Sequence, residues 1–225
     1  MGTYETMAAG EHTTRLYTAG QPGAGRSGVI VFHAWWGLVG DVVAYADRLA
    51  ASGFAVVAPD LYRGPTASTI EEAEQLSSEL DEGAADLIAL ASVDWLAGRL
   101  GPTARLAAVG FSLGAAWSMW SPAQRDRLAA SVVYYGTLEG TSLTRATVPV
   151  LGHFAEADPY EPDEGVAAFE TTLRSAGRDV AIHRYPGTGH WFAEPSRDAY
   201  SPPAAELAFT RTVAFLERQL GAPPA

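Results

Sequence analysis

The chain has 225 residues, with 15 basic against 26 acidic side chains and a formal net charge of −11, and its composition is that of a folded globular protein. The negative charge disfavours binding to nucleic acid, and no apolar run is long enough to cross a membrane. All the basic residues are arginine and cysteine is absent, which excludes lysine Schiff-base chemistry and thiolate catalysis.

Short apolar runs bounded by turn residues alternate with segments of helical spacing. The first element is a polar stretch over residues 3–18, which predicts an antiparallel hairpin at a sheet edge, followed by a turn over 20–27. The predicted strands are residues 28–33, 55–58, 105–109, 130–135, 149–154 and 180–185. The predicted helices are 41–52, one or two pieces within 70–100, 113–120, 164–176 and 203–220, before a frayed tail at 221–225. This alternation predicts one α/β domain over residues 1–225, a mostly parallel sheet with helices on both faces.

The segment Gly110-Phe111-Ser112-Leu113-Gly114 follows a predicted strand and opens a predicted helix. A Gly-x-Ser-x-Gly pattern in this position is typical of a nucleophile elbow, a sharp turn that exposes a serine hydroxyl at the carboxyl end of a parallel sheet. The two glycines let the strand and the helix approach closely. The pattern therefore predicts Ser112 as a nucleophile; the alternative is an ordinary glycine–serine turn.

A serine nucleophile needs a histidine as base, and the histidine needs a carboxylate on its other ring nitrogen. In folds with this elbow the acid and then the histidine follow the serine along the chain. His190 comes after a predicted strand and a glycine-rich loop at 186–189, and it is the predicted base. Asp158 follows the preceding predicted strand and is the favoured acid, with Glu156 and Asp163 as competitors.

The other candidate residues at strand ends have structural interpretations. His153 and His183 lie inside apolar strands and fit satisfied core histidines. Asp60 precedes the serine in the chain, and we expect it to form a structural ion pair with Arg63. No histidines have the spacing of a zinc site, so we expect neither a metal nor a cofactor.

An acyl-transfer site also needs two backbone N–H groups that bind the developing oxyanion. We expect these from Leu113, directly after the serine, and from Trp35, in the loop after the first parallel strand. Five of the six tryptophans flank the predicted catalytic elements, although Trp117 and Trp120 also fit core packing. The residues that we place at the substrate pocket are His33, Ala34, Trp36, Trp117, Trp191 and Phe192.

Jointly these motifs resemble the dienelactone hydrolase family of α/β-hydrolases. The resembling stretches are residues 33–38, 53–62, 110–115, 189–192 and 200–220, so the resemblance covers nearly the whole chain. It implies the α/β-hydrolase fold and a catalytic triad of Ser112, Asp158 and His190. It further implies a small enzyme that needs no cofactor and is a monomer or a weak homodimer.

Three positions depart from the family pattern. The dienelactone enzymes carry a cysteine nucleophile where this chain has Ser112, and a glutamate that gates the thiolate where it has Ala34. These two changes agree, because a hydroxyl has no resting thiolate to protect. The family also binds its substrate's carboxylate with arginines, one of them at the position of Glu194. Since no basic residue lies between Arg63 and Arg99, we expect a substrate other than dienelactone itself.

The sequence therefore predicts a serine hydrolase that cleaves an ester or lactone of a small, neutral, apolar or aromatic substrate through an acyl-enzyme. The same triad can also serve acyl transfer, cyclisation or cleavage of a carbon–carbon bond, and the same scaffold can be a binding protein without activity. Residues 1–20 have no apolar core of a secretory signal, so we expect a cytoplasmic protein with neither nucleic acid nor membrane as a partner.

Overall fold

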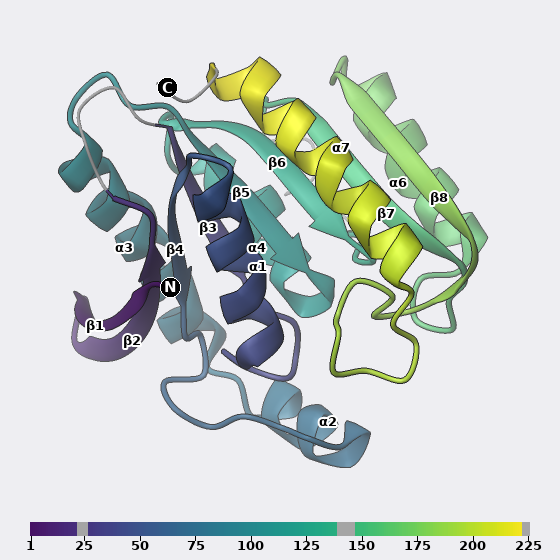
Figure 1. Cartoon of the computed structure of the whole chain (residues 1–225), viewed down its shortest axis with the longest axis horizontal. Helices are drawn as coiled ribbons and strands as arrows, with labels where there is room; N and C mark the ends of the chain where they lie inside the picture. The colour runs from purple at the N-terminus through teal and green to yellow at the C-terminus, as the bar shows by residue number, and fades with distance from the viewer. Residues whose placement is uncertain (22–26, 139–146, 222–225) are drawn as a thin grey trace.

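The computed structural model describes residues 1–21, 27–138 and 147–221, and an eight-stranded sheet runs through it (Figure 1). The strands lie in the order β1-β2-β4-β3-β5-β6-β7-β8. Pairing is parallel from β4 to β8 along this order, whereas β1 and β2 form an antiparallel hairpin at one edge, as predicted. The strand bounds are β1 Thr3–Ala9, β2 His12–Ala19, β3 Gly28–Phe32, β4 Ala55–Pro59, β5 Leu106–Phe111, β6 Leu128–Tyr134, β7 Val150–Ala157 and β8 Val180–Gly189.

Helices cover both faces of the sheet, which confirms the predicted architecture (Figure 1). One face packs against α1 (Gly40–Ala51) and α7 (Pro202–Leu220). The other packs against α3 (Glu82–Leu100), α4 (Ala115–Trp120) and α6 (Asp163–Ser175). The helix α2 (Ile70–Ser78) lies beyond one end of the sheet, and 3₁₀ turns at Ser112–Gly114 and Ser121–Ala123 flank α4. None of the helices in the described ranges is long and apolar enough to cross a membrane.

The central strands are buried on both faces, and this explains their continuous apolar sequences. In β3, Val29 and Val31 belong to the core under α1 and α7, whereas Ile30 and Phe32 belong to the core under α3. Alternate side chains of one strand therefore support both layers. Because helices cover both faces, functional groups are left to the loops at the carboxyl ends of the parallel strands.

The predicted helical stretch 70–100 divides into α2 and α3 because it contains two separate helix starts. Thr69 caps α2 in a capping box, accepting from the Glu72 N–H at 3.2 Å. The side chain of Asp81 then caps α3, accepting from the Ala84 N–H at 3.0 Å. The other predicted bounds agree to within a few residues, except around residues 186–189. The parts of the predicted turn at 20–27 and tail at 221–225 that fall on 22–26 and 222–225 lie outside the described residues.

The predicted ion pair between Asp60 and Arg63 is wrong. Asp60 is fully buried beyond β4, and its carboxylate accepts from Arg15 of β2 at 3.2 Å. Arg63 has a left-handed backbone, with φ of 62°, and its guanidinium lies 3.2 Å from the His12 ring nitrogen. The sequence suggests an ion-pair partner for Asp60 three residues away, but its actual partner comes from a neighbouring strand and depends on how the strands pair in the sheet.

The tight contact between the elbow and β3 generates a prediction about stability. A Cβ atom on Gly114 would lie 2.5 Å from the Phe32 carbonyl oxygen and 2.6 Å from that of His33. Gly114→Ala should therefore lower the free energy of unfolding by about 1–3 kcal/mol in urea titrations. The matched control is Gly98→Ala in α3, where nothing lies within 4 Å, and it should raise stability by about 0.5–1 kcal/mol. Equal unfolding midpoints for the two variants would contradict this account.

Candidate active site

Ser112 follows β5 directly and has a left-handed backbone, with φ of 47°. Such a conformation costs a non-glycine residue about 1–3 kcal/mol and persists only where the surroundings enforce it. Here the surroundings are tight, because a Cβ on Gly110 would lie 2.2 Å from the Gly114 carbonyl oxygen. The glycines of the motif thus permit the sharp turn, and the strained serine marks a position of functional interest.

The structure brings the three predicted catalytic side chains together. The Oγ of Ser112 lies 3.0 Å from Nε2 of His190, and Nδ1 of the same ring lies 2.7 Å from Oδ2 of Asp158. Because a carboxylate only accepts hydrogen bonds, Nδ1–H is the donor, and Nε2 is left to accept from the serine hydroxyl. The side chains of His190 and Asp158 are 4% and 1% exposed, so the bond between them is shielded from water, whereas Ser112 is half-buried.

Asp158 is oriented by the turn that follows β7. Its Oδ1 accepts from the backbone N–H of Tyr160 at 2.9 Å and of Glu161 at 3.1 Å, the pattern of an Asx turn. The same oxygen lies 2.9 Å from His190 Nδ1, so both carboxylate oxygens contact the ring. The turn therefore orients the carboxylate toward the imidazole.

The two competing acids are occupied elsewhere. Glu156 accepts from the backbone N–H of Gly187 at 2.8 Å, and Asp163 forms an ion pair with Arg184 at 2.9 Å. In the described structure His190 hydrogen-bonds the carboxylate of Asp158 and neither of these two.

His190 does not sit on a free glycine-rich loop, and that part of the sequence interpretation is wrong. Residues 186–189 continue β8, and Gly189 pairs with Ala157 of β7 after a shift in register. Gly187 has a left-handed backbone within this irregular stretch, with φ of 70°, and the chain leaves the sheet at His190 and Trp191, the second with φ of 65°. Because His190 directly follows paired strands, its ring is held in place without a flexible arm.

Aromatic rings surround the outer side of His190. The ring centroids of Tyr160 and Trp191 lie 4.8 Å and 4.9 Å from the imidazole, and Trp35 lies 5.5 Å from Tyr160 and 5.8 Å from Trp191. We call Trp35, Tyr160 and Trp191 the aromatic cluster. Sequence reasoning missed Tyr160, although its position two residues after an Asx-turn aspartate was an available signal.

The inner side of the imidazole rests on Tyr135, which was also missed. Its ring centroid lies 4.9 Å from that of His190, and its hydroxyl donates to Oε1 of Glu194 at 2.8 Å. Glu194 is only 3% exposed, and its Oε2 has no hydrogen-bond partner among the described residues. Burial, with a further contribution from Asp41, raises the pKa of Glu194 to about 8. Glu194 is therefore a mostly neutral core residue at pH 7 and not a charge beside the substrate.

Three of the residues placed at the substrate pocket are internal instead. His33, Ala34 and Phe192 are 0%, 1% and 0% exposed, so their side chains cannot touch a ligand in this conformation. The His33 ring donates from Nδ1 to the Ala34 carbonyl at 2.7 Å and accepts the Leu61 N–H on Nε2 at 3.0 Å. Burial lowers the pKa of His33, and the neutral ring joins the loop after β3 to the chain after β4.

The remaining predicted pocket residues do reach cavities. Trp36 and Trp191 line a cavity of about 350 Å³ together with Arg197, whose guanidinium lies 3.7 Å from the centre of the Trp36 ring. Trp117 lines another cavity, of about 300 Å³, next to Leu113. The indole N–H groups of Trp35, Trp36 and Trp191 are buried and have no acceptor within the described part of the chain. The region thus holds several donors without acceptors.

Of the two strand histidines, His153 is a satisfied core residue, as expected, whereas His183 is only half-buried, with its ring stacked 5.9 Å from that of His153. His153 is fully buried, with Nδ1 2.7 Å from the Tyr185 hydroxyl and Nε2 3.0 Å from the Thr212 hydroxyl. Burial holds the pKa of His153 well below its usual range and also lowers that of His183. Within the described ranges, no group of three or more His, Asp or Glu side chains could hold a metal ion.

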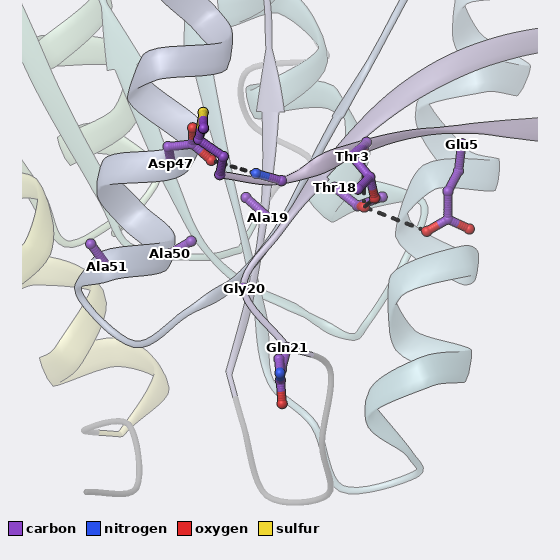
Figure 2. A pocket seen from close by; sticks show the side chains of 11 residues that line it. Thr3, Glu5, Thr18, Ala19, Gly20, Gln21, Asp47, Ala50 and Ala51 are labelled. Carbon is purple, nitrogen blue, oxygen red and sulfur yellow. Dashed lines mark hydrogen bonds between the residues drawn. The ribbon is translucent and has the colours of Figure 1, made fainter.

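A larger cavity, of about 540 Å³, lies in a different part of the molecule (Figure 2). It is bounded by the start of β1, the end of β2 and the last turns of α1, and Figure 2 shows mostly small side chains around it. Its Asp47 carboxylate already accepts from the Tyr17 hydroxyl at 2.8 Å and from the Gly2 N–H at 3.0 Å. Neither a triad residue nor a sequence neighbour of one lines it, so size alone does not identify the site.

The parallel sheet, the elbow after β5 and the chain order of serine, acid and histidine define the α/β-hydrolase class. The family model of the dienelactone hydrolase family matches residues 14–220. The chain is 33% identical over 210 residues to "Protein usf" of Aquifex pyrophilus, spanning 88% of this chain and 91% of that protein. It is 30% identical over 203 residues to a putative carboxymethylenebutenolidase of Aquifex aeolicus, spanning 85% and 88% of the two chains.

Comparison with solved structures gives the same fold as the family match. A crystal structure of a putative dienelactone hydrolase from Klebsiella pneumoniae superposes with a TM-score of 0.84 at 24% identity, covering 97% of this chain and 98% of that one. The chain therefore belongs to the dienelactone hydrolase family, and it is a hydrolase of the ester and lactone class.

The buried Glu194 generates a prediction about pH. Its folded-state pKa of about 8 lies above the ordinary value of 4.5, so its contribution to stability is complete below pH 4.5 and is lost as the pH rises toward 8. Glu194→Gln cannot ionise, and relative to this variant the wild type should lose on the order of 3 kcal/mol between pH 4.5 and pH 7. Urea unfolding across that range measures the difference. The exposed Glu217→Gln should follow the wild type, and a constant gap for Glu194→Gln would contradict the prediction.

Proposed function

We propose that this chain is a serine esterase or lactonase that cleaves a small neutral substrate through Ser112, His190 and Asp158. The single observation that supports this most is the continuous hydrogen-bond chain, 3.0 Å from serine to imidazole and 2.7 Å from imidazole to carboxylate. The Oγ of Ser112 attacks the carbonyl carbon while Nε2 of His190 takes its proton, and Asp158 stabilises the imidazolium. The ring then protonates the departing alkoxide, and water releases the acid from the acyl-enzyme.

The oxyanion is assigned to the backbone N–H groups of Leu113 and Trp35. The first follows the nucleophile, as the elbow geometry requires, and the second comes from the loop after β3. This loop lies against the elbow, since Gly114 approaches the carbonyls of Phe32 and His33 too closely for a Cβ. The two N–H donors thus come from loops that pack against each other. The hydrogen bonds of the His33 ring hold the loop that carries the Trp35 N–H.

The surroundings of His190 support an apolar, uncharged leaving group. The aromatic cluster offers flat apolar surface there, which suits an apolar leaving group. Burial and the carboxylates of Glu74 and Asp158 raise the pKa of Tyr160, so negative potential reaches the cluster. One relative is named for carboxymethylenebutenolide, a lactone that carries a carboxylate. The substrate that we propose for this chain differs from that lactone because it carries no charge.

Covalent labelling tests the nucleophile. A fluorophosphonate probe should label the wild type on Ser112, and Ser112→Ala should lose both labelling and ester hydrolysis. His190→Ala and Asp158→Asn should remain folded, with hydrolysis reduced by roughly 10³-fold or more. Ser118→Ala is the matched control, because this serine is buried on α4 with its hydroxyl bonded to the Ala115 carbonyl. Undiminished labelling of Ser112→Ala, read by mass spectrometry, would remove the assignment.

The charge of the leaving group is tested with two isosteric butyrate esters, of 4-hydroxybenzamide and of 4-hydroxybenzoate. After correction for their rates with hydroxide, the neutral ester should have a kcat/KM about fivefold higher, because Glu74 lies close enough to act on the aromatic cluster. Glu74→Gln should narrow this gap, while Glu217→Gln should leave it unchanged. A preference for the carboxylate would instead point to Arg197 as a binding group and refute the neutral pocket.

A further inference from the structure

A cavity of about 300 Å³ begins at Leu113, one residue after Ser112. On the helix side it is lined by Leu113, Ala116, Trp117 and Trp120. Leu80, between α2 and α3, and Leu138, after β6, belong to the same lining. The proposed triad mechanism does not use this space.

The helix residues lie three and four positions apart, so they form one stripe along the elbow turn and α4. Leu113 and Trp120 are seven helical steps apart, and at about 1.5 Å a step the stripe extends over about 10 Å. Leu113, Ala116 and Trp120 are half-buried, and the indole of Trp117 is fixed because its Nε1 donates to Oδ1 of Asp86 at 2.9 Å. The result is an apolar groove with a fixed aromatic wall that starts at the nucleophile's neighbour.

The mechanism determines which half of an ester belongs here. The leaving group must lie beside Nε2 of His190, which protonates it, and that side is occupied by the aromatic cluster. The carbonyl oxygen must lie at the N–H of Leu113, so the acyl chain departs from the elbow on the other side. The groove begins at this same residue.

We propose that the groove is the acyl pocket and that it selects esters of unbranched, uncharged acids of about six to eight carbons. This assignment rests on the proposed function. A volume of about 300 Å³ equals roughly ten water-sized groups at about 30 Å³ each, and part of it is open to solvent. A chain of six to eight carbons fits both that volume and the length of the stripe.

Charge at the groove excludes acyl groups that end in a carboxylate. Glu82 and Asp86 line it together with the apolar residues, and no basic side chain is part of the lining. Asp86 is half-buried, and this partial burial raises its pKa. A second carboxylate in this place would be both desolvated and repelled, so the pocket suits monocarboxylic acids.

Isomeric esters separate the acyl side from the alcohol side. Ethyl hexanoate and hexyl acetate have the same atoms, but only the first carries its chain on the acid. In pH-stat assays the wild type should hydrolyse ethyl hexanoate at least tenfold faster, by kcat/KM, than hexyl acetate. Ala116→Phe fills the groove, and it should lower kcat/KM for ethyl hexanoate about tenfold while leaving hexyl acetate within twofold.

The matched control is Ala167→Phe, the same substitution at an exposed position of α6, which should change neither ester. Trp120→Ala lengthens the groove at its far end, and it should move the preferred acyl chain from hexanoate or octanoate toward decanoate. Thermal unfolding shows whether each variant is folded. If Ala116→Phe does not fold, the chain-length profile of Trp120→Ala tests the acyl pocket by itself.

Each outcome distinguishes the two proposals. If Ser112 takes up the fluorophosphonate but both variants keep the wild-type chain-length profile, the groove is not the acyl pocket. An equal loss on both isomers in folded Ala116→Phe likewise overturns the assignment. If the wild type neither hydrolyses any ester nor takes up the probe, the proposed function itself fails, and the acyl pocket fails with it.

Discussion

The left-handed backbone of Ser112 is the constraint on which the rest of the site depends. A strained turn at the end of a buried strand survives only if its neighbours leave it no other conformation, and here those neighbours are the backbone of β3 and the first turn before α4. The free energy needed to hold it comes from the packed core beneath, where β3, β5 and β6 are buried on both faces. Stability of the sheet and exposure of one hydroxyl are therefore linked.

The imidazole of His190 is also held in place, by contacts on both sides of the ring and at one of its nitrogens. Asp158 fixes one nitrogen, Tyr135 supports the inner face of the ring, and the aromatic cluster covers the outer side. Tyr135 is in turn bonded to Glu194, a side chain that comes from the turn after His190 itself. Residues from the ends of β6, β7 and β8 thus meet at one ring, because parallel strands bring their carboxyl ends to the same edge.

The sequence was sufficient for the parts of this arrangement that follow from chain order. Ser112, Asp158 and His190 each follow a strand, and neighbouring parallel strands must place such residues near one another. Tyr135, Tyr160 and Glu194 could not be found in the same way, because their roles come from side-chain packing between turns. The Asp60 pairing failed for the same reason, since Arg15 is adjacent only through the antiparallel edge of the sheet. A motif predicts backbone geometry well, but it does not predict the protonation state of a buried side chain. Burial raises the pKa of Glu194, so a residue that looks charged in the sequence is mostly neutral at pH 7 in the folded protein.

The aromatic cluster places two fluorescent tryptophan side chains close to His190. The indole of Trp191 lies in edge contact with the imidazole of His190, and Trp35 is stacked on that indole. Indole emission is sensitive to a nearby cation, so each change in the charge of His190 is felt by two fluorophores without any added dye. The intrinsic fluorescence of this protein therefore includes a signal from the immediate surroundings of His190.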